Sequence, residues 1–262
     1  MTQLLCRRDP GPMLERLTRH RPVAIQTSLA LMMGLLFSLA FGARAVSAQE
    51  PTTSNEFWPE IDVYINLKPK LRLYLLGTVS KSVEDGDLRN ASGFEAQFGA
   101  HIDYLPNEHV ILRTGYRFGT SVGQTGEPFK EHRLLTEQTL RKLLPGGLML
   151  SDRNREDFRF VNGDFSFRYR NRVTLEREFH LFRKRPVTPY VSGEIFYDTR
   201  SSAWNRNRFG AGVQISLRRS SVLKMLMPKH QVILDLYYMR QNDSRSDSPH
   251  VNAAGAALTF YF

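Results

Sequence analysis

The sequence predicts an all-β protein, a transmembrane up-and-down β-barrel of antiparallel strands. Three observations lead to this fold class. The N-terminal region has the form of an export signal. Apolar and polar side chains then alternate with a period of two residues, and the polar ones include many arginines and carboxylates. We expect about twelve strands, with ten as the alternative, because eleven strand-like segments can be counted and single-chain bacterial barrels have even numbers.

Residues 1–48 are predicted to be a signal peptide that precedes a barrel domain at residues 49–262. Arginines lead into an apolar run of 13 residues at positions 29–41, too short for a comfortable transmembrane helix. Small residues follow this run, so we expect the signal to be cleaved before Gln49, with a cleavage site at Ala45 as the alternative. An uncleaved inner-membrane anchor is the other interpretation of this segment.

Composition narrows the chemistry of the exported part. The only cysteine is Cys6, within the predicted signal, so residues 49–262 can form neither a disulfide nor a thiolate metal site. Residues 1–48 hold six Lys or Arg and two Asp or Glu, so the formal charge of +10 becomes +6 for the remainder. Export argues against nucleic acid as the partner of this charge. Arginine-rich, paired charge fits a lumen or a lipopolysaccharide-facing rim better.

Residues 164–177 show the alternation most clearly. One face carries Phe165, Phe167, Tyr169, Val173 and Leu175. The other carries Ser166, Arg168, Arg170, Arg172, Thr174 and Glu176. A soluble sheet would bury the apolar face, whereas a membrane barrel turns it to lipid and encloses the charges. Because each unpaired buried charge costs several kcal/mol, this many charges favours the barrel over a soluble β-sandwich or lipocalin-like binding cup.

The same alternation predicts the other strands in chain order. They are expected at residues 60–67, 71–79, 94–104, 110–118, 131–143, 147–156, 191–198, 208–217, 231–238 and 258–262. Tight turns are expected at residues 67–70, 105–108 and 144–147, and longer loops at 81–90, 119–130, 155–163, 199–205 and 241–250. A twelfth crossing would lie in residues 56–59 or in the link after residue 179, and residues 222–227 could form a helical turn. Short turns on one side and longer loops on the other are typical of barrels.

Aromatic residues recur near the ends of the apolar faces, as in the interfacial girdles of membrane barrels. They are Trp58, Tyr104, Tyr116, Phe118, Tyr169, Tyr197, Tyr238 and Phe262. The aromatic strand that ends at Phe262 looks like the signal that such barrels present to the barrel-assembly machinery. We therefore expect as partners the assembly machinery, outer-membrane lipid and lipopolysaccharide.

The inward faces of the expected strands define a lumen charge network. Its candidate members are Arg113, Arg117, Arg133, Glu137, Arg153, Arg155, Arg168, Arg170, Arg172, Glu194, Asp198, Arg206, Arg208 and Asp235. Guanidinium groups pair with carboxylates through two parallel hydrogen bonds, so such a network can brace a narrow, filled barrel. The alternative is a narrow anion path, or a cradle for a phosphate-bearing ligand.

The sequence contains no convincing catalytic constellation. An outer-membrane lipid-modifying hydrolase would need a histidine beside a serine at the rim, and Ser248 and His250 offer this spacing only at a loop end. His101 and Asp103 share a face, but two ligands make a poor metal site. We therefore assign no catalytic, cofactor-binding or metal-binding residue.

The order of several motifs resembles the family catalogued as domain of unknown function 2490, a set of bacterial outer-membrane β-barrel proteins. The resemblance is carried by residues 57–60 (FWPE), 115–117 (GYR), 131–133 (EHR), 152–155 (DRNR), 168–172 (RYRNR), 189–190 (PY), 193–198 (GEIFYD), 204–208 (WNRNR) and 236–238 (LYY). It implies an outer-membrane location and a barrel architecture. The family has no agreed activity, so it supplies no functional residue.

Overall fold

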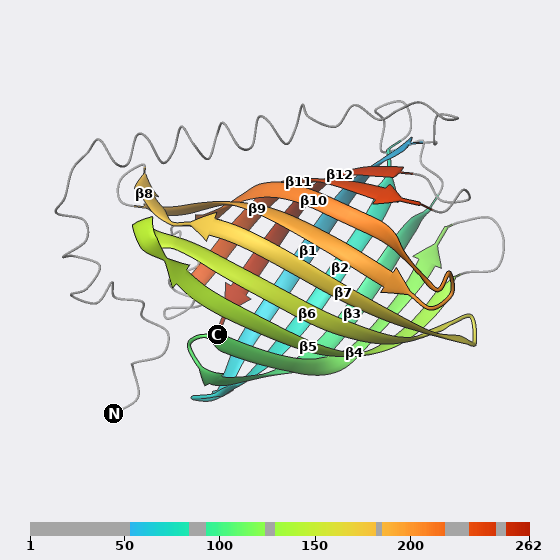
Figure 1. Ribbon diagram of the computed structural model, residues 1–262, viewed down its shortest axis with the longest axis horizontal. Helices are drawn as coiled ribbons and strands as arrows, with labels where there is room; N and C mark the ends of the chain where they lie inside the picture. The colour runs from blue at the N-terminus through green and yellow to red at the C-terminus, as the bar shows by residue number, and fades with distance from the viewer. Residues whose placement is uncertain (1–52, 84–92, 124–128, 182–184, 218–230, 245–249) are drawn as a thin grey trace. The chain divides into compact units, whose positions relative to one another are not determined.

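The computed structural model describes residues 53–83, 93–123, 129–181, 185–217, 231–244 and 250–262, and these are almost entirely strands (Figure 1). The strands are β1 (Thr53–Lys68), β2 (Leu71–Ser82), β3 (Phe94–Asn107), β4 (Val110–Val122), β5 (Lys130–Leu144), β6 (Leu148–Val161), β7 (Asp164–Arg177), β8 (Phe179–Leu181), β9 (Arg185–Asp198), β10 (Ala203–Ser216), β11 (Gln231–Asp243) and β12 (His250–Tyr261). A short 3-10 helix, η1 (Pro145–Gly147), joins β5 to β6. Within the described residues no helix is long and apolar enough to cross a membrane.

Eleven of these twelve strands close into one barrel. Neighbours from β1 to β7 pair in order, β7 pairs with β9, and β9 to β12 continue the ring until β12 meets β1. The twelfth strand, β8, pairs with β9 alone, over three residues. The predicted all-β barrel is therefore confirmed. β8 lies in the link that was one of the two predicted places for a twelfth crossing. At three residues it is too short to span the barrel from end to end.

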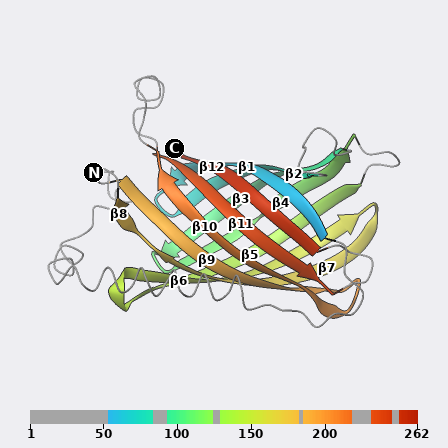
Figure 2. The ribbon, with the colours of Figure 1, turned by 90° about the horizontal axis from the view of Figure 1, so that it is seen from above.

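The odd number of crossings makes the closing pair parallel. β1 and β12 lie side by side and run in the same direction (Figure 2). Twelve residue pairs join them, and Phe262 adds an N–H bond to the carbonyl of Tyr64 at 2.8 Å. The expected antiparallel pattern thus holds around the ring except at this seam, because an odd ring must contain one parallel pair.

The two faces of the wall are inverted relative to a soluble protein. Outward side chains are large and apolar, for example Phe98 at 60% and Phe165 at 59% exposure. Inward side chains include Asp103 and Asp157, both at 0% exposure. Apolar surface on this scale is costly in water, so the wall is built to meet an apolar solvent.

Side chains fill the interior between the charges. Tyr74, Leu76 and Phe196 are inward and almost completely buried. Beneath two further inward tyrosines the wall carries glycine: a Cβ at Gly212 would come within 2.6 Å of the Tyr190 ring, and one at Gly255 would overlap the Tyr237 ring. Large side chains therefore lie over positions that lack one, which is how a narrow barrel reaches interior packing density.

Two predictions about individual segments are wrong. Residues 155–163 were expected to form a loop, but β6 continues to Val161 and turns through Asn162 and Gly163, whose φ angles of 51° and 98° suit a two-residue hairpin. Trp58 was expected in the aromatic girdle but faces inward. It packs against Met239 and Val251, with the Arg208 guanidinium 5.2 Å from its ring centre.

Other predicted features lie outside the described residues. The signal peptide at residues 1–48 and the helical turn at residues 222–227 both fall there. They remain predictions.

Candidate functional site

The interior ion-pair network begins at Asp103 on β3. The Arg72 guanidinium of β2 approaches one carboxylate oxygen of Asp103 at 2.7 Å, and Arg113 of β4 donates to the other at 2.6 Å. The Arg113 guanidinium also makes a cation–π contact, 4.0 Å from the ring centre of Tyr74. The Tyr74 hydroxyl in turn donates a hydrogen bond to Asp62 at 2.8 Å. Neighbouring strands place these groups together because facing residues on adjacent strands share one face.

Two carboxylates on β5 and β6 form the centre of the network. Asp157 accepts a hydrogen bond from Arg155 at 2.9 Å and has the Arg170 and Arg133 guanidiniums at 3.7 and 3.9 Å. Glu137 has Arg113, Arg153 and Arg155 within 3.8 Å. Each carboxylate is thus shared among several arginines, and each of these arginines contacts more than one strand.

Two further carboxylates on β9 continue the network to the opposite wall. Glu194 has the Arg172 guanidinium at 3.0 Å, Arg153 at 3.2 Å and Arg170 at 3.5 Å. Asp198 accepts from Arg168 at 2.7 Å and has the Arg159 guanidinium at 3.3 Å. The contacts therefore run from β2 to β10, and they tie together strands that are not neighbours in the ring, such as β6 and β9.

The structure places every predicted lumen residue on the inner face. Most contact a carboxylate, as described above. Arg117 donates to His101 at 3.2 Å, Arg208 to Gln241 at 2.8 Å, and Arg206 to Asp243 at 2.7 Å. Asp235 accepts hydrogen bonds from Tyr190 at 3.1 Å and Gln214 at 3.5 Å.

Several central members were not in the predicted set. Among them are Glu131, Asp157, Arg159 and Asp243. Asp157 and Arg159 continue the parity of Arg153 and Arg155, a signal that was present in the sequence. A run of charges of this kind resembles a polar loop, and only the outward Phe158 and Phe160 mark it as a strand.

Arginines contact both members of the His101 and Asp103 pair. Asp103 binds two guanidiniums, and His101 accepts from Arg117 and stacks on Tyr74 at 5.0 Å between ring centres. Within the part of the chain that the structure describes, no three His, Cys, Asp or Glu side chains cluster in a way that could hold a metal ion. The His250 ring accepts a hydrogen bond from the backbone N–H of Asp243 at 3.2 Å, while Ser248 lies outside the described residues.

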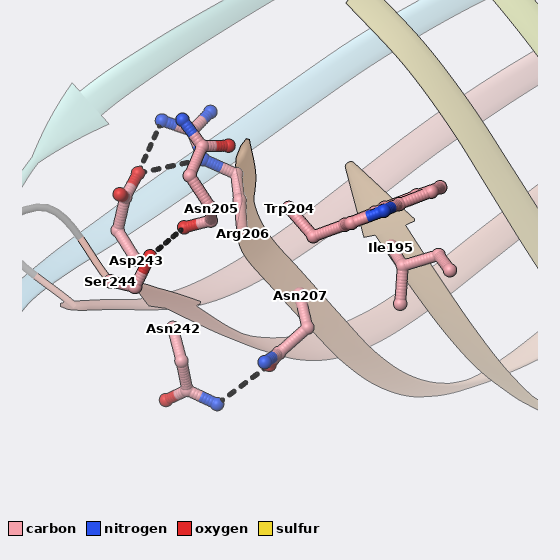
Figure 3. Close-up of a pocket in the computed structure, with 8 residues that line it drawn as sticks. All are labelled: Ile195, Trp204, Asn205, Arg206, Asn207, Asn242, Asp243 and Ser244. Atoms are coloured by element: carbon pink, nitrogen blue, oxygen red, sulfur yellow. Dashed lines mark hydrogen bonds and ion pairs between the residues drawn. The ribbon is translucent and has the colours of Figure 1, made fainter. Parts of the chain in front are cut away.

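A second candidate site is a hollow of about 270 Å³ near the loop end of β9, β10 and β11 (Figure 3). Ile195 and Trp204 form its apolar part. On another side, the Asn242 side-chain amide donates to the side-chain oxygen of Asn207 at 3.0 Å. Exposed aromatic rings beside amides are typical of the level at which a barrel meets lipid headgroups.

Comparison with known families supports the resemblance in the sequence. The family described as protein of unknown function, DUF2490, matches residues 55–252. The chain belongs to this family. Among curated proteins, no match to the chain was found.

Solved structures similar to this DUF2490 chain include three from bacteria. The β-domain of the Bordetella autotransporter BrkA has 16% identity and a TM-score of 0.42, over 67% of this chain and 79% of that one. LpxR from Salmonella typhimurium has 10% identity and a TM-score of 0.45, over 72% and 83%. The siderophore receptor PirA from Pseudomonas aeruginosa has 12% identity and a TM-score of 0.26, over 67% and 32%.

Proposed function

We propose that this protein is an outer-membrane β-barrel whose lumen is a closed, ion-paired core, and that it acts through its outer wall and loop end. The observation that carries the proposal is the inversion of the wall, with Phe98 and Phe165 outward and Asp103 and Asp157 fully enclosed. Hydrocarbon is the solvent that such a surface matches, and a closed ring of strands satisfies every backbone group within it.

The pairing of the arginines favours a brace over an anion cradle. Arg153, Arg155, Arg168, Arg170 and Arg172 each lie within 4 Å of an aspartate or glutamate oxygen. An entering phosphate would have to displace these carboxylates from their ion pairs. Ion pairs that join several strands instead fix the positions of the groups they connect.

Export and assembly form part of the same proposal. A cleaved signal at residues 1–48 would deliver the chain across the inner membrane. The strand that ends at Phe262 would then present the assembly signal to the barrel-assembly machinery. The location of β12 supports this role, since its final residues form the seam that closes the ring against β1. Lipopolysaccharide is the proposed partner at the loop end.

Membrane insertion is tested by fractionation and a heat-shift gel. The proposal predicts recovery with the outer membrane after mild detergent, and faster migration of the unheated protein than of the boiled protein. Recovery in the soluble periplasmic fraction without detergent would support the binding-cup alternative and contradict the proposal.

The closed lumen is tested in planar lipid bilayers. Purified barrel should produce no regular single-channel steps, because side chains fill the interior. Regular conductance of the unaltered protein would show that the lumen is a pore.

The lipid-modifying hydrolase remains a distinct alternative. It predicts the release of fatty acid from outer-membrane lipid on overexpression, and loss of that activity in His250→Ala. The described residues favour the non-enzymatic proposal, because the Nδ1 atom of His250 already accepts the Asp243 backbone hydrogen bond.

A further inference from the structure

One part of the outer wall breaks the apolar pattern at mid-height. Asp152, Asn154 and Glu156 occupy consecutive outward positions at the middle of β6. In the described strands, the other acidic residues lie on the inward face or at a strand end, so two outward carboxylates here are exceptional. Polar groups at the centre of a bilayer are expensive and mark functional surfaces.

Side chains of the adjacent strands extend these positions into a polar stripe, which we define as Thr136, Gln138, Asp152, Asn154, Glu156, Tyr169 and Asn171. The strand register places Gln138 beside Asn154, and Asn154 beside Asn171. The stripe therefore crosses three strands, β5 to β7.

Much of the stripe is bonded within itself. The Asn171 amide donates to Asp152 at 2.6 Å and to Asn154 at 3.0 Å, and the Tyr169 hydroxyl donates to Asn154 at 2.5 Å. Thr136 donates to one oxygen of Glu156 at 2.9 Å. Gln138 is exposed, and no described residue hydrogen-bonds its amide. The stripe thus keeps both donor and acceptor capacity on its outer side.

Apolar side chains border the stripe above and below. Leu134 is 56% exposed, Leu140 is 42% exposed and Phe158 is 37% exposed. A polar centre inside an apolar border is the arrangement of a buried interface, in which the border excludes solvent and the centre fixes the pairing.

We infer that this stripe is the contact surface for a second copy of the same chain in the membrane. The inference rests on the proposed membrane insertion. A two-fold rotation about the membrane normal keeps each residue at its own depth, so the stripe of one copy meets the stripe of the other while apolar borders meet apolar borders. Such an isologous contact requires a surface that offers donors and acceptors together, and the stripe offers amides and carboxylates.

Crosslinking in native membranes tests the inference. Cys6 is the only cysteine of the chain, so with Cys6→Ser as background a single new thiol reports its own neighbours. Gln138→Cys lies in the stripe. Phe98→Cys, an outward and 60% exposed position on β3, is the matched control. With a short bifunctional thiol reagent, we expect a product of twice the chain mass for Gln138→Cys, several-fold stronger than for Phe98→Cys.

A second variant tests whether the polar groups of the stripe are needed for pairing but not for folding of the barrel. Thr136→Val, Gln138→Leu and Glu156→Leu together remove the polar groups of the stripe on β5 and at Glu156, and leave Asp152, Asn154, Tyr169 and Asn171 hydrogen-bonded among themselves, which a monomer in lipid tolerates. In this variant the thiol is introduced by Leu134→Cys, because position 138 is now leucine. We expect the crosslinked pair to be lost while the heat-shift of the barrel is kept. A heat-shift that is absent from the unaltered protein would show that membrane insertion itself is wrong.

Three results would overturn the inference with insertion intact. One is equal crosslinking at Phe98→Cys, and another is a product from Gln138→Cys with a mass other than twice the chain, which would indicate a different membrane protein. The third is no product from Gln138→Cys, which would mean that the stripe faces lipid alone.

Discussion

Asp157 is one of the most deeply buried charges of the interior. Its side chain has no exposure, and the guanidiniums of Arg155, Arg170 and Arg133 surround it. Removal of one partner from a buried ion pair leaves charge without compensation, which is more harmful than replacing the whole pair by apolar groups. The interior pairs thus make individual carboxylates indispensable, even where the network as a whole adds little net stability.

We predict that Asp157→Ala lowers the free energy of unfolding by about 3–5 kcal/mol, because three arginines lose their shared carboxylate. The urea dependence of the heat-shift in lipid vesicles measures this change. Asp164→Ala is the control, since Asp164 is exposed at the start of β7 and should change stability by less than about 0.5 kcal/mol. Similar effects of the two substitutions would show that the interior network is not what stabilises the barrel.

At the scale of single strands, alternation was sufficient where both faces are strongly marked. In β7 the apolar face of Phe165 and Phe167 and the charged face of Arg168 and Arg170 predicted the orientation that the structure has. In β6 the outward face is mixed, with carboxylates at Asp152 and Glu156 followed by phenylalanines. Apolar and polar residues therefore do not alternate clearly there, and the sequence did not predict the full strand. The strand ends could not be predicted for the same reason, because polar residues of the wall and of the loops are chemically alike.

Depth along a strand should decide the cost of an outward charge. Leu236 lies near the centre of β11 and is 43% exposed, whereas Leu112 lies near the start of β4, also on the outward face, and is 39% exposed. We predict that Leu236→Arg costs about 2–4 kcal/mol and Leu112→Arg about 0–1 kcal/mol, because arginine at the bilayer midplane cannot reach water. Unfolding titrations in vesicles measure both. Equal costs at the two depths would contradict a lipid-facing wall.

At the scale of the whole molecule, the sequence predicted a closed barrel but not its odd strand number. Eleven strand-like segments can be counted in the sequence, and the general preference of barrels for even numbers favours twelve. The parallel pairing of β1 with β12 resolves the difference, since it closes the ring without another crossing. Pairing between the two ends of a chain leaves no local pattern in either strand, so sequence periodicity cannot show it.

The two ends of the barrel should face different compartments. Glu108 lies in a two-residue connection between β3 and β4, and Asp164 lies at the opposite end, where β6 turns into β7. Connections 69–70, 108–109 and 145–147 at the Glu108 end are two or three residues long, whereas connections 83–93 and 123–129 at the Asp164 end are longer. Because short turns belong to the periplasmic side, we predict that a membrane-impermeant thiol reagent labels Asp164→Cys in intact cells and labels Glu108→Cys only after the outer membrane is permeabilised. The reverse pattern would invert the proposed orientation.

Quenching of tryptophan by brominated lipid tests the inverted wall most directly. The chain has two tryptophans: Trp58 lies inside, against Arg208, and Trp204 is outward and 57% exposed. Single-tryptophan proteins follow from Trp204→Phe and Trp58→Phe, and each is reconstituted in brominated and ordinary lipid. We predict strong quenching of Trp204 and little quenching of Trp58. Quenching of Trp58 with Trp204 unaffected, or of neither, would contradict the prediction.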